Sequence, residues 1–430
     1  MEKEKKILIK NGLVVDVEEK KKSEIKDILI EGKVIKKIEK NIEDNEADVI
    51  DAKGNIIMPG FINTHSHIAM TFFRGYAEGY NLMDWLNKKI WPVEDKLTKE
   101  DVYNSSKLGI LEMIKTGTTT FLDMYFLVDG TIEAINEVGI RACLSRCIMN
   151  TESDDDIRIK ETYDLLKRFG DGQNELITFM VGPHSEYVCD IPTLKRCVKI
   201  AKENNIGLHI HLSETQDEIK TIREKYNKTP VELLEDVGAF SVPLVLAHGV
   251  WVNESDIKLL QRIKGGISHN PVSNAKLGSG IAPIKKYIDN NITVGIGTDG
   301  DCSTSSLDMF LEMKLTGYFQ KATLLDSTAL DAFEILQMAT INGAKLLNME
   351  NKTGSIKEGK LADLIIIDGK SLNINPINDI YTSLVYSANG NDVLTTIVNG
   401  RVIMKDRKFE CVNEEEVLEK CGEVASKLLK

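Results

Sequence analysis

Features that would place a protein in a membrane or outside the cell are absent from this 430-residue sequence. No stretch reaches the roughly 18 consecutive apolar residues that a membrane-spanning helix requires. The N-terminal segment MEKEKKILIK is charged and lacks the apolar run of a secretory signal peptide. The seven cysteines are scattered, and none forms a C-x-x-C pair, which is typical of reduced and mostly buried thiols. We therefore expect a cytoplasmic protein with no membrane partner.

Basic residues are fewer than acidic residues in this sequence. The chain has 54 Lys and Arg against 66 Asp and Glu, which gives a formal net charge of −12. Nucleic acids and anionic membrane surfaces are bound by basic faces, so the composition predicts no nucleic-acid partner. With 42% hydrophobic residues, the chain can bury a large core. The number of subunits is left open, and a homo-oligomer is compatible with the sequence.

Both ends of the chain are predicted to be rich in β-strands. Residues 5–58 alternate apolar and polar side chains around Asn-Gly and Glu-Gly turns, which indicates hairpins. The same type of pattern recurs near the end of the sequence in LADLIIID and VLTTIVNGRVIMKD. We expect the segments 1–58 and 349–430 to form one composite β-sandwich domain. An amphipathic helix over 413–430 would close the chain.

The middle of the chain, residues 59–348, alternates short apolar runs with amphipathic helical patterns, which predicts parallel βαβ units. The eight runs span residues 60–67, 118–124, 141–149, 176–185, 207–214, 244–249, 265–271 and 293–300. Eight such units predict an α/β fold of the TIM-type (β/α)8 barrel class. Active sites of such barrels lie at the C-terminal ends of the strands.

Histidine is scarce, yet its placement is far from random. All seven histidines lie in these eight runs, and six of them lie toward the C-terminal ends: His65, His67, His184, His211, His248 and His269. Asp299 closes the eighth run. Imidazoles from several strand ends together with one carboxylate form a ligand set suited to Zn²⁺ or Fe²⁺. His209 lies earlier on its run and is interpreted as a core residue or as support for a ligand.

Glu214 follows His211 by three residues in HIHLSE. That offset could place its carboxyl beside a metal-activated water without making it a ligand, which suits a general acid or base. The alternative is a carboxylate in the first turn of a helix, favoured by the helix dipole.

Five motifs in fixed order resemble the amidohydrolase superfamily: PGFINTHSH, HIHLSE, AHG, SHNPVSN and GTDG. Within it, the chain is most similar to deaminases of 5-methylthioadenosine and S-adenosylhomocysteine. The resemblance implies a metal held by His65, His67, His211 and Asp299. Binuclear members carry a bridging lysine at the end of the fourth strand, whereas this chain has FMVGPHS there. One divalent metal is therefore expected, with Zn²⁺ favoured and Fe²⁺ or Mn²⁺ as alternatives.

The resemblance also implies the chemistry. Glu214 would protonate the purine ring nitrogen and transfer the proton of the water. His248 would orient the hydroxide, and Asp299 would take the second proton and pass it to the departing ammonia. The product would be the inosine analogue.

Substrate contacts are implied at Glu94, His184, Arg146 and Arg158, in addition to Glu214 and Asp299. Glu94 would accept the ribose hydroxyls, although without the family it is a solvated helix-start acid. Arg146 lies in the apolar run RACLSRCIM. Because an unpaired buried arginine is costly, it indicates an anion in the site, such as an amino-acid carboxylate. Arg158 follows an acidic run and could instead form a surface ion pair.

Several further residues have two interpretations. Four aromatic residues after the first strand could wall a nucleoside pocket or pack in the core: Phe72, Phe73, Trp85 and Trp91. His269 and Asn270 are expected to support the site. Ser303, Thr304 and Ser305 are expected to cap the next helix and could line the pocket as well.

Two alternatives stay open beside this deaminase. One is a relative acting on guanine, cytosine or a triazine. The other is a non-catalytic scaffold barrel, which is disfavoured because no metal ligand and no acid/base residue is missing. Among substrates, 5-methylthioadenosine, S-adenosylhomocysteine, 5-deoxyadenosine and adenosine are not ranked by the sequence.

Overall fold

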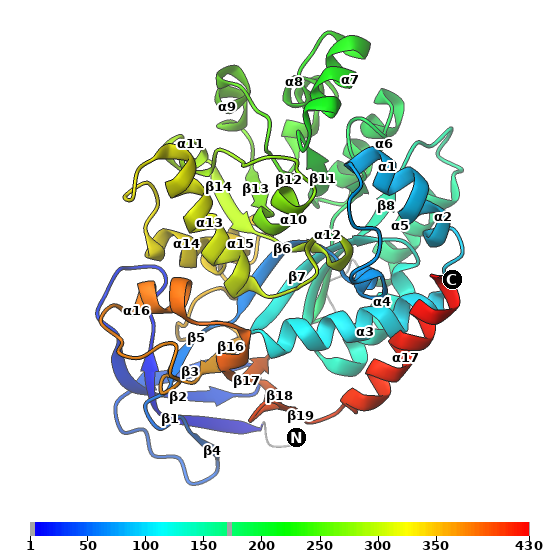
Figure 1. The fold of residues 1–430 in the computed structure, drawn as a ribbon. Coiled ribbons are helices and arrows are strands. Elements are labelled where there is room, and N and C mark those ends of the chain that lie inside the picture. The colour runs from blue at the N-terminus through cyan, green and yellow to red at the C-terminus, as the bar shows by residue number, and fades with distance from the viewer. Residues whose placement is uncertain (1–4, 170–173, 430) are drawn as a thin grey trace.

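Parallel strands and helices alternate through the middle of the chain (Figure 1). The computed structural model describes residues 5–169 and 174–429. Each of the eight predicted runs contains a strand, so this prediction is confirmed. The strands are β6 Phe61–His67, β7 Thr118–Tyr125, β8 Arg141–Ile148, β9 Ile177–Phe179 with β10 Gly182–Pro183, β11 Leu208–Leu212, β12 Leu244–His248, β13 Gly265–His269, and β14 Thr293–Ile296 with β15 Asp299–Gly300.

Parallel pairing connects these strands in two groups. One group has the order β10-β8-β7-β6-β15, with β9 also paired to β8, and the other has the order β11-β12-β13-β14. Two single parallel bridges, Val181 to Leu208 and Ser185 to His211, link the fourth run to β11. At the other end β14 leads into β15, which pairs with β6. The C-terminal ends of all these strands therefore lie on one side of the molecule.

Helices follow most of the strands. They are α3 Lys99–Lys115, α4 Val128–Val138, α5 Ile157–Phe169, α6 Ile191–Glu203, α7 Gln216–Tyr226, α8 Pro230–Asp236, α9 Glu254–Leu260, α10 Pro271–Lys276, α11 Ile284–Asp289, α12 Asp301–Thr304, α13 Met309–Leu324, α14 Ala332–Met338 and α15 Ile341–Leu346. Several begin where the sequence supplies an N-cap. Thr98, Thr215 and Thr229 each form a capping box with the third residue of the helix.

Between β6 and α3, two short helices flank a five-residue π-helical turn (Leu86–Ile90). They are α1 Leu82–Trp85 and α2 Trp91–Glu94. This segment lies at the C-terminal side of the strands, where it covers the pocket described below.

Strands from the two ends of the chain form one nine-stranded sheet. Its order is β19-β18-β17-β16-β5-β1-β2-β3, with β4 paired to β1. The N-terminal strands are β1 Lys6–Val14, β2 Glu24–Glu31, β3 Val34–Glu39, β4 Asp48–Asp51 and β5 Ile56–Pro59; the C-terminal strands are β16 Leu364–Ile367, β17 Val393–Val398, β18 Arg401–Lys405 and β19 Lys408–Phe409. In Figure 1 the blue N-terminal and orange-red C-terminal strands lie together below the helices.

Gly60 alone separates the terminal strand β5 from β6, the first strand of the central part. A Cβ atom on Gly60 would lie 2.1 Å from Cγ2 of Thr119. The chain can therefore pass this close to β7 only because residue 60 lacks a side chain.

A buried ion pair joins the terminal sheet to the central strands. Arg141, the first residue of β8, donates from Nε to Oδ2 of Asp363 at 2.8 Å. Asp363 also accepts hydrogen bonds from the Asn399 backbone and from the Thr353 hydroxyl. The buried carboxylate is thus well satisfied, and it fixes the sheet against one strand of the central part.

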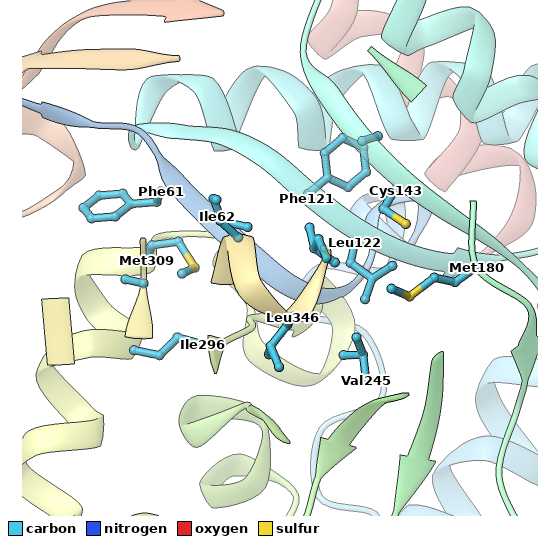
Figure 2. Close-up of a cluster of buried hydrophobic side chains, with 14 of the residues drawn as sticks. Phe61, Ile62, Phe121, Leu122, Cys143, Met180, Val245, Ile296, Met309 and Leu346 are labelled. Atoms are coloured by element: carbon cyan, nitrogen blue, oxygen red, sulfur yellow. The ribbon is translucent and has the colours of Figure 1, made fainter. Parts of the chain in front are cut away.

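The main core lies between the strands and their helices. Figure 2 shows Ile62 of β6, Leu122 of β7, Val245 of β12 and Leu346 of α15 converging there. All four side chains are almost fully buried. The chain ends in α17 Glu414–Leu428, which confirms the predicted closing helix and lies along α3 (Figure 1).

In the part of the chain that the structure describes, no helix is both long and apolar enough to cross a membrane. All seven cysteines are free, and six are buried, as predicted; Cys411 is exposed.

Candidate metal centre and active site

Side chains from the C-terminal ends of several strands meet in one buried cluster. Two overlapping groups have ligand atoms within 4.8 Å of one another: His65, His67 and His211 form one, and His65, His248 and Asp299 form the other. The predicted ligands thus come together, and His248 lies close enough to belong to the same cluster.

Hydrogen bonds on the outer side of two rings fix which nitrogen faces inward. His67 Nδ1 lies 2.6 Å from the Met124 carbonyl, and His211 Nδ1 lies 2.6 Å from the His184 carbonyl. A carbonyl only accepts, so both Nδ1 atoms carry the proton and donate it. In the neutral rings both Nε2 atoms then present lone pairs, and these face each other at 3.2 Å.

Asp299 brings a negative charge to the same point. Its Oδ1 lies 3.4 Å from His65 Nε2 and 3.3 Å from His67 Nε2. Burial alone would raise the pKa of Asp299, but its contacts with His65 and His67 lower it well below the ordinary value. The carboxylate therefore stays ionised. Its other oxygen accepts from Ser273 Oγ at 2.5 Å and from Ser303 Oγ at 3.0 Å.

This donor set fits a divalent cation. When both rings are neutral, lone pairs from His67 and His211 face each other at 3.2 Å, beside an ionised carboxylate. His65 Nε2 is buried and has no hydrogen-bond partner among the described residues. Imidazole nitrogens and one carboxylate are ordinary Zn²⁺ ligands. A cation satisfies all of these groups at once.

His248 and Glu214 lie next to each other at this cluster. His248 Nδ1 is 2.8 Å from Asn274 Oδ1, so it donates there and turns Nε2 toward Glu214, whose Oε2 is 3.8 Å away. Glu214 is 3% exposed, and burial raises the pKa of its carboxyl. Ser279 Oγ donates to its Oε1 at 3.1 Å. A carboxyl with a raised pKa next to the cluster is suited to act as a general acid or base.

The backbone at these strand ends is strained. His248 has φ 75° and Asp299 has φ 66°, in the left-handed region that non-glycine residues rarely adopt. Strained conformations of this kind gather at functional sites, where the surrounding structure holds them. Two of the predicted site residues therefore carry an independent structural sign of function.

A pocket opens over the cluster. It is lined on one side by the His67, His211 and Asp299 side chains and on the other by Trp85 and Trp91. His184 also lines it, and its ring lies edge-on to Trp91 at 6.5 Å between centroids. Phe72 and Phe73 instead pack in a hydrophobic cluster next to it, so for these two rings the core interpretation is correct.

Glu94 lines the same pocket from the end of α2. Tyr125 Oη, at the end of β7, donates a 2.7 Å hydrogen bond to Glu94 Oε1. Burial raises the pKa of Glu94 to about 7, although this hydrogen bond opposes the shift. Glu94 is therefore a pocket carboxyl and not a solvated helix-start acid.

Arg146 and Arg158 lie together at an adjoining cavity of about 340 Å³, which shares Trp91 and Glu94 with the first pocket. The premise that Arg146 is unpaired is wrong. Arg146 Nε donates to Glu161 Oε2 at 2.7 Å, because α5 brings that acid against β8. The guanidinium also lies over the Phe126 ring.

Arg158 forms the ion pair that the sequence offered as its alternative. It donates from Nε and Nη2 to the two oxygens of Asp156, at 2.9 and 2.7 Å. Both arginines therefore border the cavity with a carboxylate partner already in place.

Some residues of the site could not be predicted from local sequence patterns. Tyr125, Asn274 and Ser279 bond Glu94, His248 and Glu214, but each pair is 26 to 65 residues apart in the chain. Asn274 does lie in the motif SHNPVSN, but from this motif we predict His269 and Asn270 as the residues that support the site. Asn270 Nδ2 lies 3.3 Å from His248 Nδ1, whereas neither ring nitrogen of His269 has a hydrogen-bond partner among the described residues.

The predicted capping role of Ser303, Thr304 and Ser305 is wrong. Ser303 and Thr304 lie inside α12, and Ser305 ends it with φ 66°. Asp308 caps the next helix, α13. Ser303 lines the pocket and bonds Asp299.

A cluster of histidines and a carboxylate at the C-terminal ends of parallel strands is typical of metal-dependent hydrolases. The model of the Amidohydrolase family matches residues 56–403, and the chain belongs to this family.

Curated relatives cover nearly the whole chain. A 5-methylthioadenosine/S-adenosylhomocysteine deaminase of Thermococcus onnurineus is 46% identical over 94% of this chain and 95% of its own length. A 5'-deoxyadenosine deaminase of Methanosarcina acetivorans is 42% identical over 98% of each chain. Among solved structures, an adenosine deaminase from Xanthomonas campestris with bound zinc is 28% identical and superposes with a TM-score of 0.95, covering 99% of each chain.

Proposed function

We propose that this enzyme is a hydrolytic deaminase of adenosine-type nucleosides with a modified 5′ position. It replaces the 6-amino group of 5-methylthioadenosine or S-adenosylhomocysteine by oxygen and releases ammonia. 5'-Deoxyadenosine and adenosine fit the same site. The names of relatives at 46% and 42% identity support this substrate class.

The observation that carries the proposal is the placement of Glu94 in the same pocket as Glu214. Glu214 lies at the cluster, where the reacting ring would be held, and Glu94 lies on the pocket wall that leads to the arginine cavity. A carboxylate accepts hydrogen bonds from a vicinal diol. The pocket thus presents acid/base chemistry at one end and ribose recognition at the other, which a free guanine or triazine does not require.

His65, His67, His211 and Asp299 are the residues that would hold one divalent cation, Zn²⁺ by preference. When bound, the cation supplies the Lewis acidity that makes water a nucleophile at neutral pH. The zinc in the adenosine deaminase structure supports this choice, and Fe²⁺ and Mn²⁺ stay alternatives.

Three side chains carry the protons. Glu214, whose pKa burial raises, accepts a proton from the attacking water and delivers one to the ring nitrogen. His248 is held by Asn274 and directs Nε2 toward the attacking oxygen. Asp299 accepts the remaining proton of that oxygen and passes it to the amino group, which leaves as ammonia. One water is consumed for each ammonia released.

The 5′ substituent would lie toward Arg146 and Arg158. His184 and the Trp91 ring border the nucleoside pocket, and the two arginines border the cavity beyond Glu94. Because Glu161 and Asp156 already pair with them, an incoming carboxylate would share or replace an existing partner.

We infer that the central strands form the predicted (β/α)8 barrel over residues 59–348. The two bridges to β11 and the pairing of β15 with β6 support it. Residues 1–58 and 349–430 would be the composite domain. A bridge between Val34 of β3 and Leu361, just before β16, supports a sheet that folds back as a sandwich.

The test is an ultraviolet assay with the zinc-loaded protein that follows loss of each compound's own chromophore, which is the adenine ring for the nucleosides. The panel contains 5-methylthioadenosine, S-adenosylhomocysteine, 5'-deoxyadenosine and adenosine, with guanine, cytosine and a triazine as the competing classes. The proposal is supported if the 5′-modified adenosines are turned over while guanine and the triazine are not. Turnover of guanine, cytosine or the triazine alone contradicts it, and no turnover of any compound favours the scaffold.

A further inference from the structure

His65 lies at the end of a chain of three buried hydrogen bonds. Its Nδ1 is 2.7 Å from His209 Nε2, and His209 Nδ1 is 2.9 Å from Ser145 Oγ. Ser145 Oγ in turn donates to the Asp123 carbonyl at 2.7 Å. His65 and His209 are both 0% exposed, and Ser145 is 1% exposed.

The carbonyl at the far end gives this chain a single direction. A hydroxyl has one proton, and Ser145 uses it toward the Asp123 oxygen, so Ser145 can only accept from His209. His209 Nδ1 must therefore carry a proton. Full burial favours the neutral imidazole, which leaves His209 Nε2 as an acceptor. His65 Nδ1 then donates, and its Nε2 lone pair points into the cluster.

The other two histidines of the proposed ligand set are held differently. His67 and His211 donate their outer N–H groups to backbone carbonyls. Those carbonyls belong to the backbone, and no side-chain substitution removes them. The orientation of His65, by contrast, depends on two side chains, and both can be changed.

We propose that His209 is a positioning residue that fixes the tautomer and the ring orientation of His65, with Ser145 fixing His209 in turn. The inference rests on the proposed metal centre. Its structural role is specific, because His209 contributes no atom to the cluster and acts only through the Nδ1–H of His65. Outer hydrogen bonds of this kind typically change metal affinity 10- to 100-fold when they are removed.

Two amide variants test this contact. The Gln oxygen in His209→Gln reaches the position of Nε2 and can still accept from His65. The shorter side chain of His209→Asn reaches the position of Nδ1, so it keeps the Ser145 contact and loses the one to His65. We expect zinc affinity, measured by competition with a chromophoric chelator, to fall about 10- to 100-fold in His209→Asn and less than about threefold in His209→Gln.

A second measurement does not depend on metal or turnover. Nitrogen-15 NMR of the metal-free protein distinguishes protonated from unprotonated ring nitrogens. We expect His65 protonated at Nδ1 in the wild type and in His209→Gln, and a mixture of tautomers in His209→Asn. Ser145→Ala should also produce the mixture, because it frees His209 to carry its proton on Nε2.

The outcomes separate this inference from the proposed function. Equal zinc affinity in the Asn and Gln variants, with thermal unfolding showing both folded, overturns the positioning role. So does a wild-type spectrum with His65 protonated at Nε2. A wild type with the predicted tautomer but no zinc binding and no deamination instead contradicts the proposed function and leaves the hydrogen-bond chain supported.

Discussion

Tyr125 and Glu94 are joined by a 2.7 Å hydrogen bond from the phenol to Oε1 of the carboxyl, inside the pocket above the histidine cluster. Tyr125 lies at the end of β7 and Glu94 at the end of α2. The bond holds one carboxyl oxygen and leaves the other directed to whatever enters the pocket. Tyr125 therefore orients the group that we propose accepts the ribose hydroxyls.

Tyr125→Phe removes this bond and keeps the ring. A neutral hydrogen bond contributes about 0.5–1.5 kcal/mol, which corresponds to roughly 2- to 12-fold. We expect KM for 5-methylthioadenosine to rise by that factor while kcat changes less than about twofold. Steady-state kinetics measure both, and an unchanged KM would mean that Tyr125 does not orient the substrate ligand.

Glu94→Gln should make stability less dependent on pH. The folded protein keeps a proton on Glu94 up to about pH 7, whereas an unfolded chain releases it near its ordinary pKa of 4.5. The stability that this carboxyl contributes is fully present below pH 4.5 and is lost as the pH rises through 7. The loss is at most about 3 kcal/mol.

Unfolding by guanidinium at pH 5 and at pH 8 tests the Glu94 prediction. The variant should lose less stability than the wild type between the two pH values, and it should also bind both nucleoside substrates more weakly. Parallel pH profiles for the two proteins would show that Glu94 does not hold its proton in the folded state.

Removal of a ligand should release the metal. His65→Ala or Asp299→Asn is expected to lower bound zinc from about one per chain to well below it and to abolish turnover. A chelator should lower the Tm of the wild type, because a ligand that binds only the folded state stabilises it. Elemental analysis decides the count, and two tightly bound metals in the wild type would refute the single-metal expectation.

Glu214→Gln keeps the shape of the side chain and removes the titratable proton. Zinc content should stay at the wild-type level while kcat falls by at least about 10². Ser279→Ala serves as the matched control, because it removes only the 3.1 Å hydrogen bond to Glu214 and should reduce kcat far less. Near-normal kcat in Glu214→Gln would remove Glu214 from the proton transfers.

Arg146→Met should distinguish tail recognition from nucleoside recognition. A charge-assisted bond to a substrate carboxylate contributes roughly 1.5–3 kcal/mol, equivalent to about 10- to 150-fold in kcat/KM. Because Glu161 competes for the guanidinium, we expect the lower end for S-adenosylhomocysteine and little change for 5-methylthioadenosine. Arg158→Met shows whether one arginine or two take part. Equal losses for both substrates would make Arg146 a structural residue.

Regular spacing made most of the fold and the cluster predictable. His65 and His67 alternate with Ser66 on one strand, so both rings project to the same face. The strand ends of a parallel arrangement then bring His211 and Asp299 to the same place. These inferences need only local sequence, since each ligand sits at the end of an apolar run.

The surroundings of the cluster could not be inferred in this way. The partner of Arg146 is Glu161, which reaches it only because α5 packs against β8. His65 and His209 are 144 residues apart, and nothing near either one indicates the other. Such contacts depend on how helices and neighbouring strands pack, and packing geometry has no short repeat in the sequence.

The sheet that joins the two ends of the chain has a consequence for synthesis. Strand β5 pairs with β1 and with β16, and β16 begins at Leu364, some 300 residues after β5. While the ribosome is making the central part, one edge of β5 has no partner, and an open edge invites pairing with other chains. The edge of β5 that pairs with β16 therefore stays open until the residues from Leu364 onward have been synthesised, and the nascent protein is most vulnerable to aggregation before that point.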